Sequence, residues 1–141
     1  MLSDGSFTSV SDIDFWWALG LNWCPHTKGY VKLGGGGKYM HQLIGEKMGF
    51  VGETDHRDRD KRNNQRPNLR SATSSQNHAN TGISKVNTSG FKGVHWSDEK
   101  QKWMAKIQVK GKSHYLGYFD DPKLASDAYM SAARFHFGEF A

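Results

Sequence analysis

Residues 54–80 read TDHRDRDKRNNQRPNLRSATSSQNHAN, and they decide the fold that we predict for the first part of this chain. A strand should end at Asp55-His56, and the polar run 57–67 cannot pack as a regular element, so it predicts a loop. The chain would then return as a short strand at 68–70. A hydroxyl three residues before a glutamine, at 73–76, is typical of a helix start. The order predicted is therefore strand, loop, strand, helix.

The same stretch carries side chains suited to hydrolysing a phosphodiester bond. A neutral imidazole can take a proton from water near pH 7, so His56 is the candidate general base. Mg²⁺ prefers oxygen ligands, and Asp55 and Asn77 can each supply one. Asn68 is the candidate for the residue that orients the imidazole. These residue types predict a site for one Mg²⁺ or Mn²⁺ ion.

The order Asp-His, Asn-Asn, Asn-Leu-Arg, Gln-Asn within residues 55–77 resembles the HNH endonucleases of phages and mobile introns, which are homing enzymes. The resemblance implies a small ββα-metal nuclease fold with His56 as the base. It also implies Asp55 and Asn77 as the metal ligands, and Asn68 as the residue that holds the imidazole. In many relatives the last ligand is a histidine, so His78 is the alternative to Asn77.

The chain departs from that family at two positions. Arg59 stands where the family commonly has glycine, so we expect a remodelled loop if this position needs a positive φ. Upstream, relatives often read Met-His-Arg-Leu-Ile, whereas Gln42 replaces the arginine here, and a phosphate contact is expected to be missing. Neither departure removes a proposed ligand or the proposed base.

The N-terminal third predicts a support for this hairpin. Residues 1–11 are polar and expected to be loosely ordered, and the apolar residues within 13–21 are expected to form core. Strand-like pieces at 21–24, 29–33 and 38–44 predict an N-terminal β-meander. His26 and His41 have no partner at metal-ligand spacing, so we interpret both as structural.

The last third of the chain predicts a three-stranded antiparallel sheet and one helix. The strands are expected at 91–96, 102–109 and 113–119, and the helix from Asp121-Pro122 to about Phe135. Apolar and basic residues alternate along 102–110, so one face of the sheet should be apolar and the other basic. The alanine-rich helix should cover the apolar face.

The motifs Phe91-Lys92-Gly93-Val94, Lys102-Trp103 and Tyr115-Leu116-Gly117-Tyr118-Phe119 resemble the plant ethylene-response-factor (APETALA-type) DNA-binding domain. The match extends over nearly all of residues 89–141. It implies a sheet that enters the major groove of double-stranded DNA. Lysine, histidine or glutamine replaces arginines of the plant members, which weakens bidentate reading of guanine.

Candidate DNA contacts fall in both parts of the chain. In the nuclease-like stretch they are Arg57, Arg59, Arg62, Arg66 and Arg70. In the C-terminal module they are Lys92, His95, Lys102, Lys106, Gln108, Lys112 and Tyr115. A net charge of +5 favours a polyanionic partner, and the basic surplus lies beyond residue 52.

These observations predict an α+β protein with two modules. Residues 1–82 would form the HNH nuclease domain with its core motif at 53–80, residues 83–89 a linker, and residues 90–141 the DNA-binding domain. Cys24 is the only cysteine, and neither a signal peptide nor a membrane-spanning run is apparent. We therefore expect a cytoplasmic protein without a membrane partner, in the host cytoplasm if a phage encodes it.

The function expected is a metal-dependent DNA endonuclease of the homing type. One site per chain cuts one strand, so a double-strand break would need a homodimer or two events. The alternative is a DNA-binding regulator that keeps the nuclease fold without turnover. An RNA-binding protein is disfavoured, because the chain lacks an aromatic platform like that of common RNA modules.

Overall fold

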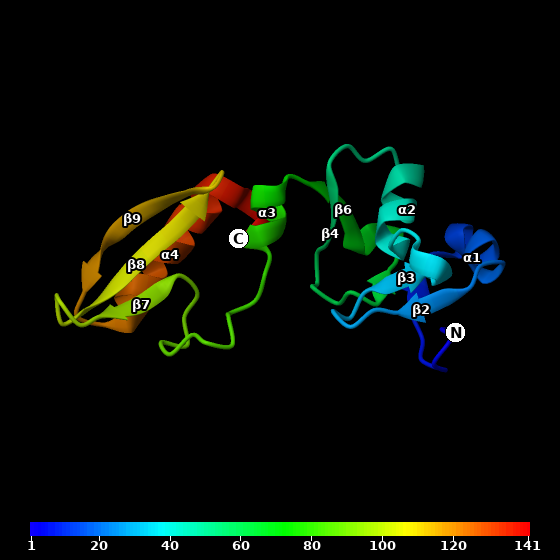
Figure 1. Cartoon of the computed structure of the whole chain (residues 1–141). Helices are drawn as coiled ribbons and strands as arrows, with labels where there is room; N and C mark the ends of the chain where they lie inside the picture. The colour runs from blue at the N-terminus through cyan, green and yellow to red at the C-terminus, as the bar shows by residue number, and fades with distance from the viewer. The chain divides into compact units, whose positions relative to one another are not determined.

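A computed structural model describes residues 1–141, and it has the mixed α+β architecture that the sequence predicts (Figure 1). The chain divides into two compact units, Met1–Ser74 and Ser75–Ala141. The nuclease boundary predicted at residue 82 and the linker predicted at 83–89 lie within the second unit. None of the helices combines the length and the apolar character needed to span a bilayer.

The first unit contains the predicted hairpin. Strands β4 (Glu53–His56) and β6 (Leu69–Ala72) pair in antiparallel fashion, with Asp55 opposite Arg70. The loop between them holds the two-residue strand β5 (Asn63–Asn64) and the 3-10 turn η2 (Arg66–Asn68). Helix α3 (Ser74–Ala79) begins where the capping pattern predicts a helix, so the order strand, loop, strand, helix is confirmed.

The N-terminal segment is ordered, and the expectation of a loose arm is wrong. Strand β1 (Ser9–Val10) pairs with β5 in parallel, with Ser9 opposite Asn63 and Val10 opposite Asn64. Leu2 is 4% exposed and belongs to the core of the unit. Backbone pairing to a distant strand, which no local pattern encodes, therefore holds this polar segment in place.

Helix α1 (Asp12–Leu19) corrects the prediction that its apolar residues form core. Ile13, Trp16 and Leu19 are 68%, 77% and 63% exposed, whereas Asp14 and Ala18 are buried. The segment forms a short helix, and only one stripe of it faces the unit. The apolar side chains on the remaining faces stay in solvent.

The predicted β-meander is also wrong in its third strand. Strands β2 (Trp23–Pro25) and β3 (Val31–Leu33) form an antiparallel hairpin, followed by the 3-10 turn η1 (Gly34–Gly36). The next segment is helix α2 (Met40–Lys47). The Gln42 side chain accepts a hydrogen bond from the Tyr39 amide at 3.2 Å, which satisfies a donor at the helix start. The buried residues follow helical spacing: Met40, His41, Ile44 and Gly45.

Helix α2 positions the strand that carries the candidate site. The core of the unit consists of Leu2, Trp23, Val31, Met40, Ile44 and Leu69. Gly45 of α2 lies so close to β4 that a Cβ atom there would be 2.2 Å from Thr54 Oγ1. Thr54 immediately precedes Asp55, so the glycine allows α2 to pack directly against the site strand.

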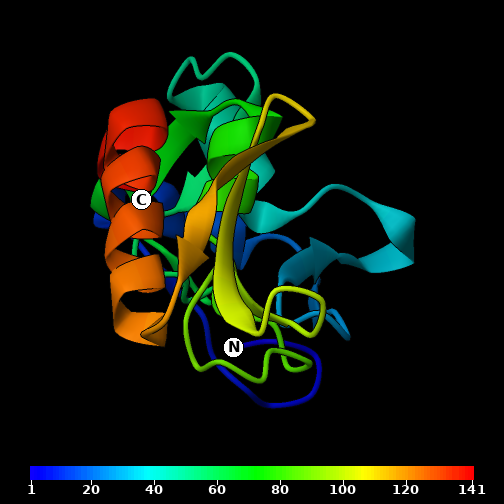
Figure 2. The same cartoon turned by 90° about the vertical axis from the view of Figure 1, so that its left-hand side faces the viewer.

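The second unit matches its prediction closely. Strands β7 (Val94–Ser97), β8 (Lys102–Val109) and β9 (Lys112–Phe119) form an antiparallel sheet in that order. Helix α4 (Pro122–Phe137) lies along one face of this sheet and is followed by the 3-10 turn η3 (Gly138–Phe140) (Figures 1 and 2). The Asp121 side chain accepts a hydrogen bond from the Lys123 amide at 2.7 Å, as expected of an N-cap. The residues buried between sheet and helix include Val94, Ala105, Ile107, Ala125 and Ala133.

Candidate active site

Asp55 and His56 end strand β4 and are both buried, with 6% and 4% of their surfaces exposed. Antiparallel pairing with β6 brings Arg70 opposite Asp55, and Arg70 Nε donates to Asp55 Oδ2 at 2.9 Å. This charge-assisted bond fixes the orientation of the carboxylate. The hairpin therefore presents a held carboxylate and an imidazole in consecutive positions.

The imidazole of His56 is bonded to Asn64, not to the residue predicted. His56 Nε2 lies 3.1 Å from Asn64 Oδ1, and Asn64 is completely buried. Asn64 Nδ2 donates to Thr8 Oγ1 at 2.9 Å, and Thr8 Oγ1 donates to the carbonyl of Arg62 at 2.7 Å. Pairing of β1 with β5 brings Thr8 to this position.

The role predicted for Asn68 is therefore wrong. Its Nδ2 donates to Asp58 Oδ1 at 2.9 Å and to the carbonyl of Asn63 at 2.7 Å, and its Oδ1 accepts from the Asp58 amide at 3.1 Å. These bonds close the loop between β4 and β6. Asn68 therefore stabilises the loop that carries Asn64, and Asn64 is the residue that contacts the imidazole.

Aromatic rings surround His56. The ring centroids of His41 and Tyr30 lie 4.9 and 6.1 Å from that of His56. Burial lowers the pKa of His56, while the Asn64 hydrogen bond and the nearby carboxylates, Asp55 first, act in the opposite direction. The imidazole is thereby neutral at neutral pH, which is the form that can accept a proton.

His41, which we interpret from the sequence as structural, lies beside His56. It is 7% exposed, and its Nδ1 has no hydrogen-bond partner in the protein. Burial, aided by the charge of His56, lowers the pKa of His41 from 6.5 to about 3. The ring therefore packs against His56 as a neutral aromatic group.

The loop position that departs from the HNH pattern does have a positive φ. Arg59 has a φ of 65°. Asp58 Oδ1 accepts from the Asp60 amide at 2.8 Å, and Asp58 Oδ2 accepts from Asn63 Nδ2 at 2.7 Å. The loop therefore adopts a turn suited to glycine and holds an arginine in it.

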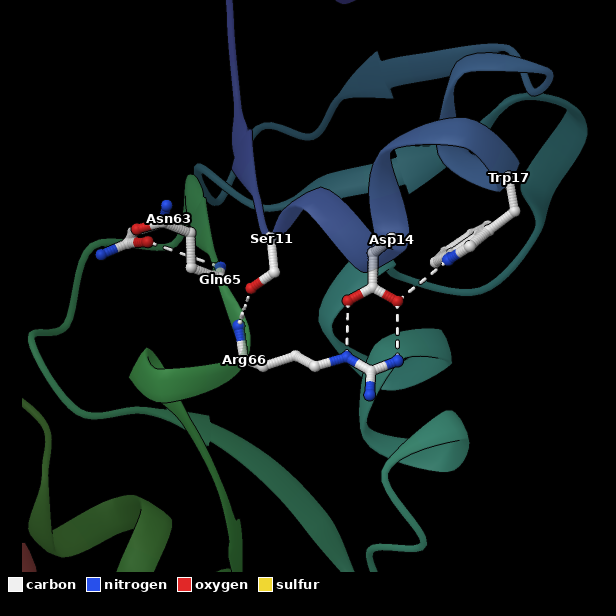
Figure 3. A network of polar contacts seen from close by, with 6 residues as sticks. All are labelled: Ser11, Asp14, Trp17, Asn63, Gln65 and Arg66. Atoms are coloured by element: carbon white, nitrogen blue, oxygen red, sulfur yellow. Dashed lines mark hydrogen bonds and ion pairs between the residues drawn. The ribbon is translucent and has the colours of Figure 1, made fainter.

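Arg66 links this loop to α1 instead of facing solvent (Figure 3). Its Nε and Nη2 donate to the two carboxylate oxygens of Asp14 at 2.7 and 2.9 Å, and its amide donates to Ser11 Oγ at 2.9 Å. Trp17 Nε1 donates to the same carboxylate at 3.0 Å. The Arg66 hydrogen bond, despite burial, lowers the pKa of Asp14. Figure 3 shows the fork of the guanidinium lying against the carboxylate.

Three of the arginines predicted to contact DNA are thus engaged within the unit. Besides Arg66, Arg70 is only 5% exposed, and Arg62 Nη1 donates to Ser6 Oγ at 2.6 Å. The prediction is wrong for Arg70, because its guanidinium is buried against Asp55. Arg57 and Arg59 are exposed in the loop.

In the second unit, the sheet face opposite α4 carries most of the residues predicted to contact DNA. The side chains of Lys106, Gln108 and Tyr115 are exposed there, and Lys106 pairs in register with Tyr115. His95 is also exposed, and burial followed by the charge of Lys106 lowers its pKa. Strands β7, β8 and β9 contain no acidic residue, so basic groups dominate this face.

Two lysines of this predicted set make bonds within the unit. Lys92 Nζ donates to the carbonyls of Ala79 and Thr81, which satisfies acceptors at the end of α3. Lys102 Nζ lies 3.0 Å from Asp120 Oδ1. Lys112 begins β9 and is exposed.

The metal ligands predicted from the sequence are divided between the two units. Asp55 lies in the first, and Asn77 and His78 lie on α3 in the second, so their pairing stays a prediction. A hard carboxylate oxygen suits Mg²⁺, but the guanidinium of Arg70 beside it opposes a cation. No group of three or more His, Cys, Asp or Glu side chains gathers into a metal site.

Comparison with known proteins identifies a relative encoded by a bacteriophage. Over 87 residues the chain is 34% identical to Protein 3.8 of Escherichia phage T7, an alignment that spans 62% of this chain and 71% of the phage protein. The chain belongs to the Protein 3.8 family. No family model matches the chain. No solved structure matches it either.

Two residues of this Protein 3.8 family member, Asn64 and Thr8, escape sequence reasoning at the site. Asn64 is the second residue of the Asn-Asn pair within the HNH-like motif at 55–77. That pair is the sequence signal that could identify Asn64 as a site residue. Thr8 lies 56 residues from Asn64, and nothing in its local sequence indicates the contact. The structural role that we interpret for His41 from the sequence agrees with its buried position against His56.

Proposed function

We propose that the protein is an HNH DNA endonuclease of the homing type, with a ββα-metal site in its first part and a DNA-binding sheet in its second. The observation that carries this proposal is the buried His56, which follows Asp55 and is held by Asn64. A neutral imidazole fixed at one nitrogen can accept a proton at the other. The sequence resemblance to HNH nucleases supports the same assignment.

In the proposed reaction His56 takes a proton from a water molecule. The water oxygen then forms a bond to phosphorus, the bond from phosphorus to the 3′ oxygen breaks, and the leaving oxygen takes a proton from solvent. Asp55 and Asn77, with His78 as the alternative, would hold one Mg²⁺ or Mn²⁺ ion. Such an ion, when bound, stabilises charge on the phosphate and the leaving oxygen.

The basic face of the β7–β9 sheet is the proposed DNA contact. Its exposed side chains lie on strands without acidic residues, which favours approach of a phosphate backbone. Lys106, Gln108 and Tyr115 stand on adjacent strands and can reach one groove together. Arg57 and Arg59 would add phosphate contacts beside the hairpin.

Nicking of supercoiled plasmid tests the nuclease. The native chain with Mg²⁺ or Mn²⁺ is expected to convert supercoiled DNA to open circles, and chelator should stop the reaction. His56→Ala should lower the rate by about 100-fold or more, because it removes the general base. His136→Ala, an exposed histidine at the end of α4, is the matched control and should retain the native rate.

If neither the native chain nor His56→Ala nicks the plasmid with Mg²⁺ or Mn²⁺, the protein is not a nuclease. Retained binding to duplex DNA in that case would support the rival function, a DNA-binding regulator built on a nuclease fold.

A further inference from the structure

We propose that Thr8 is a positioning residue of the nuclease site: through Asn64, its hydroxyl holds His56 in the tautomer that carries the proton on Nε2. This inference deepens the proposed function and rests on it for its catalytic consequence. It concerns a side chain outside the nuclease motif, in the segment that leads into β1.

The direction of each hydrogen bond follows from which atoms can donate. The carbonyl of Arg62 can only accept, so at 2.7 Å it receives the single proton of the Thr8 hydroxyl. The sulfur of Met40, 4.0 Å from the same oxygen, is a weak acceptor and does not compete. The lone pairs of Thr8 Oγ1 then face Asn64, which must donate through Nδ2 at 2.9 Å.

That bond fixes which end of the Asn64 amide meets the imidazole. With Nδ2 directed to Thr8, Oδ1 faces His56 Nε2 at 3.1 Å. A carbonyl oxygen accepts only, so Nε2 carries the proton and Nδ1 carries the lone pair. Nδ1 is therefore the atom that takes the proton from water in the proposed reaction.

Burial makes the tautomer of His56 depend on the hydrogen bonds that link Thr8, Asn64 and His56. Asn64 is 0% exposed and His56 4%, so solvent does not replace a lost partner at little cost. Without the Thr8 hydroxyl, the Asn64 amide can turn over and present Nδ2 to His56. The imidazole would then place its proton on Nδ1, where it cannot act as a base.

The test uses nitrogen NMR of the imidazole rings in the full chain, at a pH where His56 is neutral. The native chain is expected to give a protonated Nε2 and an unprotonated Nδ1 for His56. Thr8→Val, which keeps the branched shape but removes the hydroxyl, should add a substantial population of the other tautomer. Thr8→Ser should restore the native pattern, and Thr88→Val, at an exposed threonine, should not disturb it.

Plasmid nicking provides the second readout. Thr8→Val should lower kcat by about 10- to 100-fold with little change in KM, because the residue acts through the base and not through DNA binding. Thr8→Ser should recover most of the loss. A native His56 with its proton on Nδ1 would overturn the inference, and this holds even if Thr8→Val fails to fold.

An unchanged tautomer in folded Thr8→Val would overturn it as well. If the native chain does not nick DNA but His56 shows the expected tautomer, the proposed nuclease function is wrong. The role of Thr8 in fixing the tautomer through Asn64 would still be supported. The two proposals therefore fail separately.

Discussion

Arg59 occupies a backbone conformation that suits glycine, with a φ of 65°. A residue with a side chain loses about 1–2 kcal/mol of stability in the left-handed region, and glycine avoids this loss. Glycine also loses more conformational entropy on folding, which offsets part of the improvement. We therefore expect Arg59→Gly to stabilise the first unit by about 0.5–1 kcal/mol. Urea denaturation of the full chain, followed through amide resonances of residues 1–74, measures the change.

The matched control for this substitution is Arg57→Gly, at a position that lacks a positive φ. It should destabilise the same unit. If Arg59→Gly does not stabilise the unit, the backbone at Arg59 carries no strain. If both variants stabilise it, the gain does not come from the positive φ of Arg59.

His41 should make the first unit sensitive to acid. The unfolded chain binds a proton at this residue with a pKa near 6.5, whereas burial holds the folded pKa at about 3. Between these values the unfolded state binds more protons, so stability is complete above pH 6.5 and falls as the pH decreases toward 3. The loss attributable to His41 approaches about 1.4 kcal/mol per pH unit.

His41→Phe keeps a ring against His56 and removes the titration. The slope of unfolding free energy against pH, measured by urea denaturation between pH 4 and 6, should therefore decrease by about one proton. An unchanged slope would show that the buried ring is not the group that resists protonation.

At this scale the sequence predicted residue identities better than residue partners. The positions of Asp55 and His56 at the end of a strand follow from local pattern, and both side chains are there. The partner of the imidazole does not follow, because Asn64 and Asn68 have the same chemistry and only the path of the loop separates them. The burial of Arg70 does not follow from local sequence either, because the strand register places Arg70 opposite Asp55.

Among the elements, α2 sets the position of the site strand through one glycine. A methyl group at Gly45 would meet Thr54 Oγ1 at 2.2 Å and Phe50 Cδ2 at 3.2 Å. Because the threonine oxygen lies close to the backbone of β4, relief requires the helix or the strand to move. We expect Gly45→Ala to destabilise the first unit by about 1–3 kcal/mol, despite the better helix propensity of alanine.

Thermal or urea unfolding of the full chain measures this loss. Gly20→Ala is the control, since Gly20 has an ordinary φ of −74° and its nearest neighbour is 3.8 Å away. That variant should stay within about 0.5 kcal/mol of the native chain. Equal stability of Gly45→Ala and Gly20→Ala would contradict close packing of α2 on β4.

Elements were predicted well where the pattern had one interpretation. The strands and helix of the second unit show clear alternation followed by regularly spaced alanines, and all four elements are present. The strand predicted at 38–44 is wrong, because a short segment with apolar residues fits a strand or a helix equally well. The backbone amide of Tyr39 donates a hydrogen bond to the Gln42 side chain at the start of the helix. The sequence alone does not show that this bond forms.

At the scale of the whole molecule, the proposed DNA contact predicts an affinity that depends on salt. If the sheet binds a duplex, Lys106 releases a counterion when it meets a phosphate, and Lys106→Ala should reduce the slope of log affinity against log salt by about 0.9. Lys123→Ala is the control, because this exposed lysine lies on α4, which covers the opposite face. Titration of the full chain with labelled duplex at several salt concentrations measures both slopes. Equal slopes in the two variants would remove the sheet as the contact surface.

The hydrogen bonds that Asn64 donates to Thr8 and that Arg66 donates to Asp14 bear on how this protein can be engineered. A minimal peptide that starts at Glu53 would contain every residue of the recognised signature and would still lack the hydroxyl and the carboxylate that brace its loop. Grafting the signature onto another scaffold would meet the same difficulty. A transplant that keeps both this geometry and the whole HNH-like motif has to carry residues 1–77 together, which makes the first fourteen residues part of the smallest usable segment.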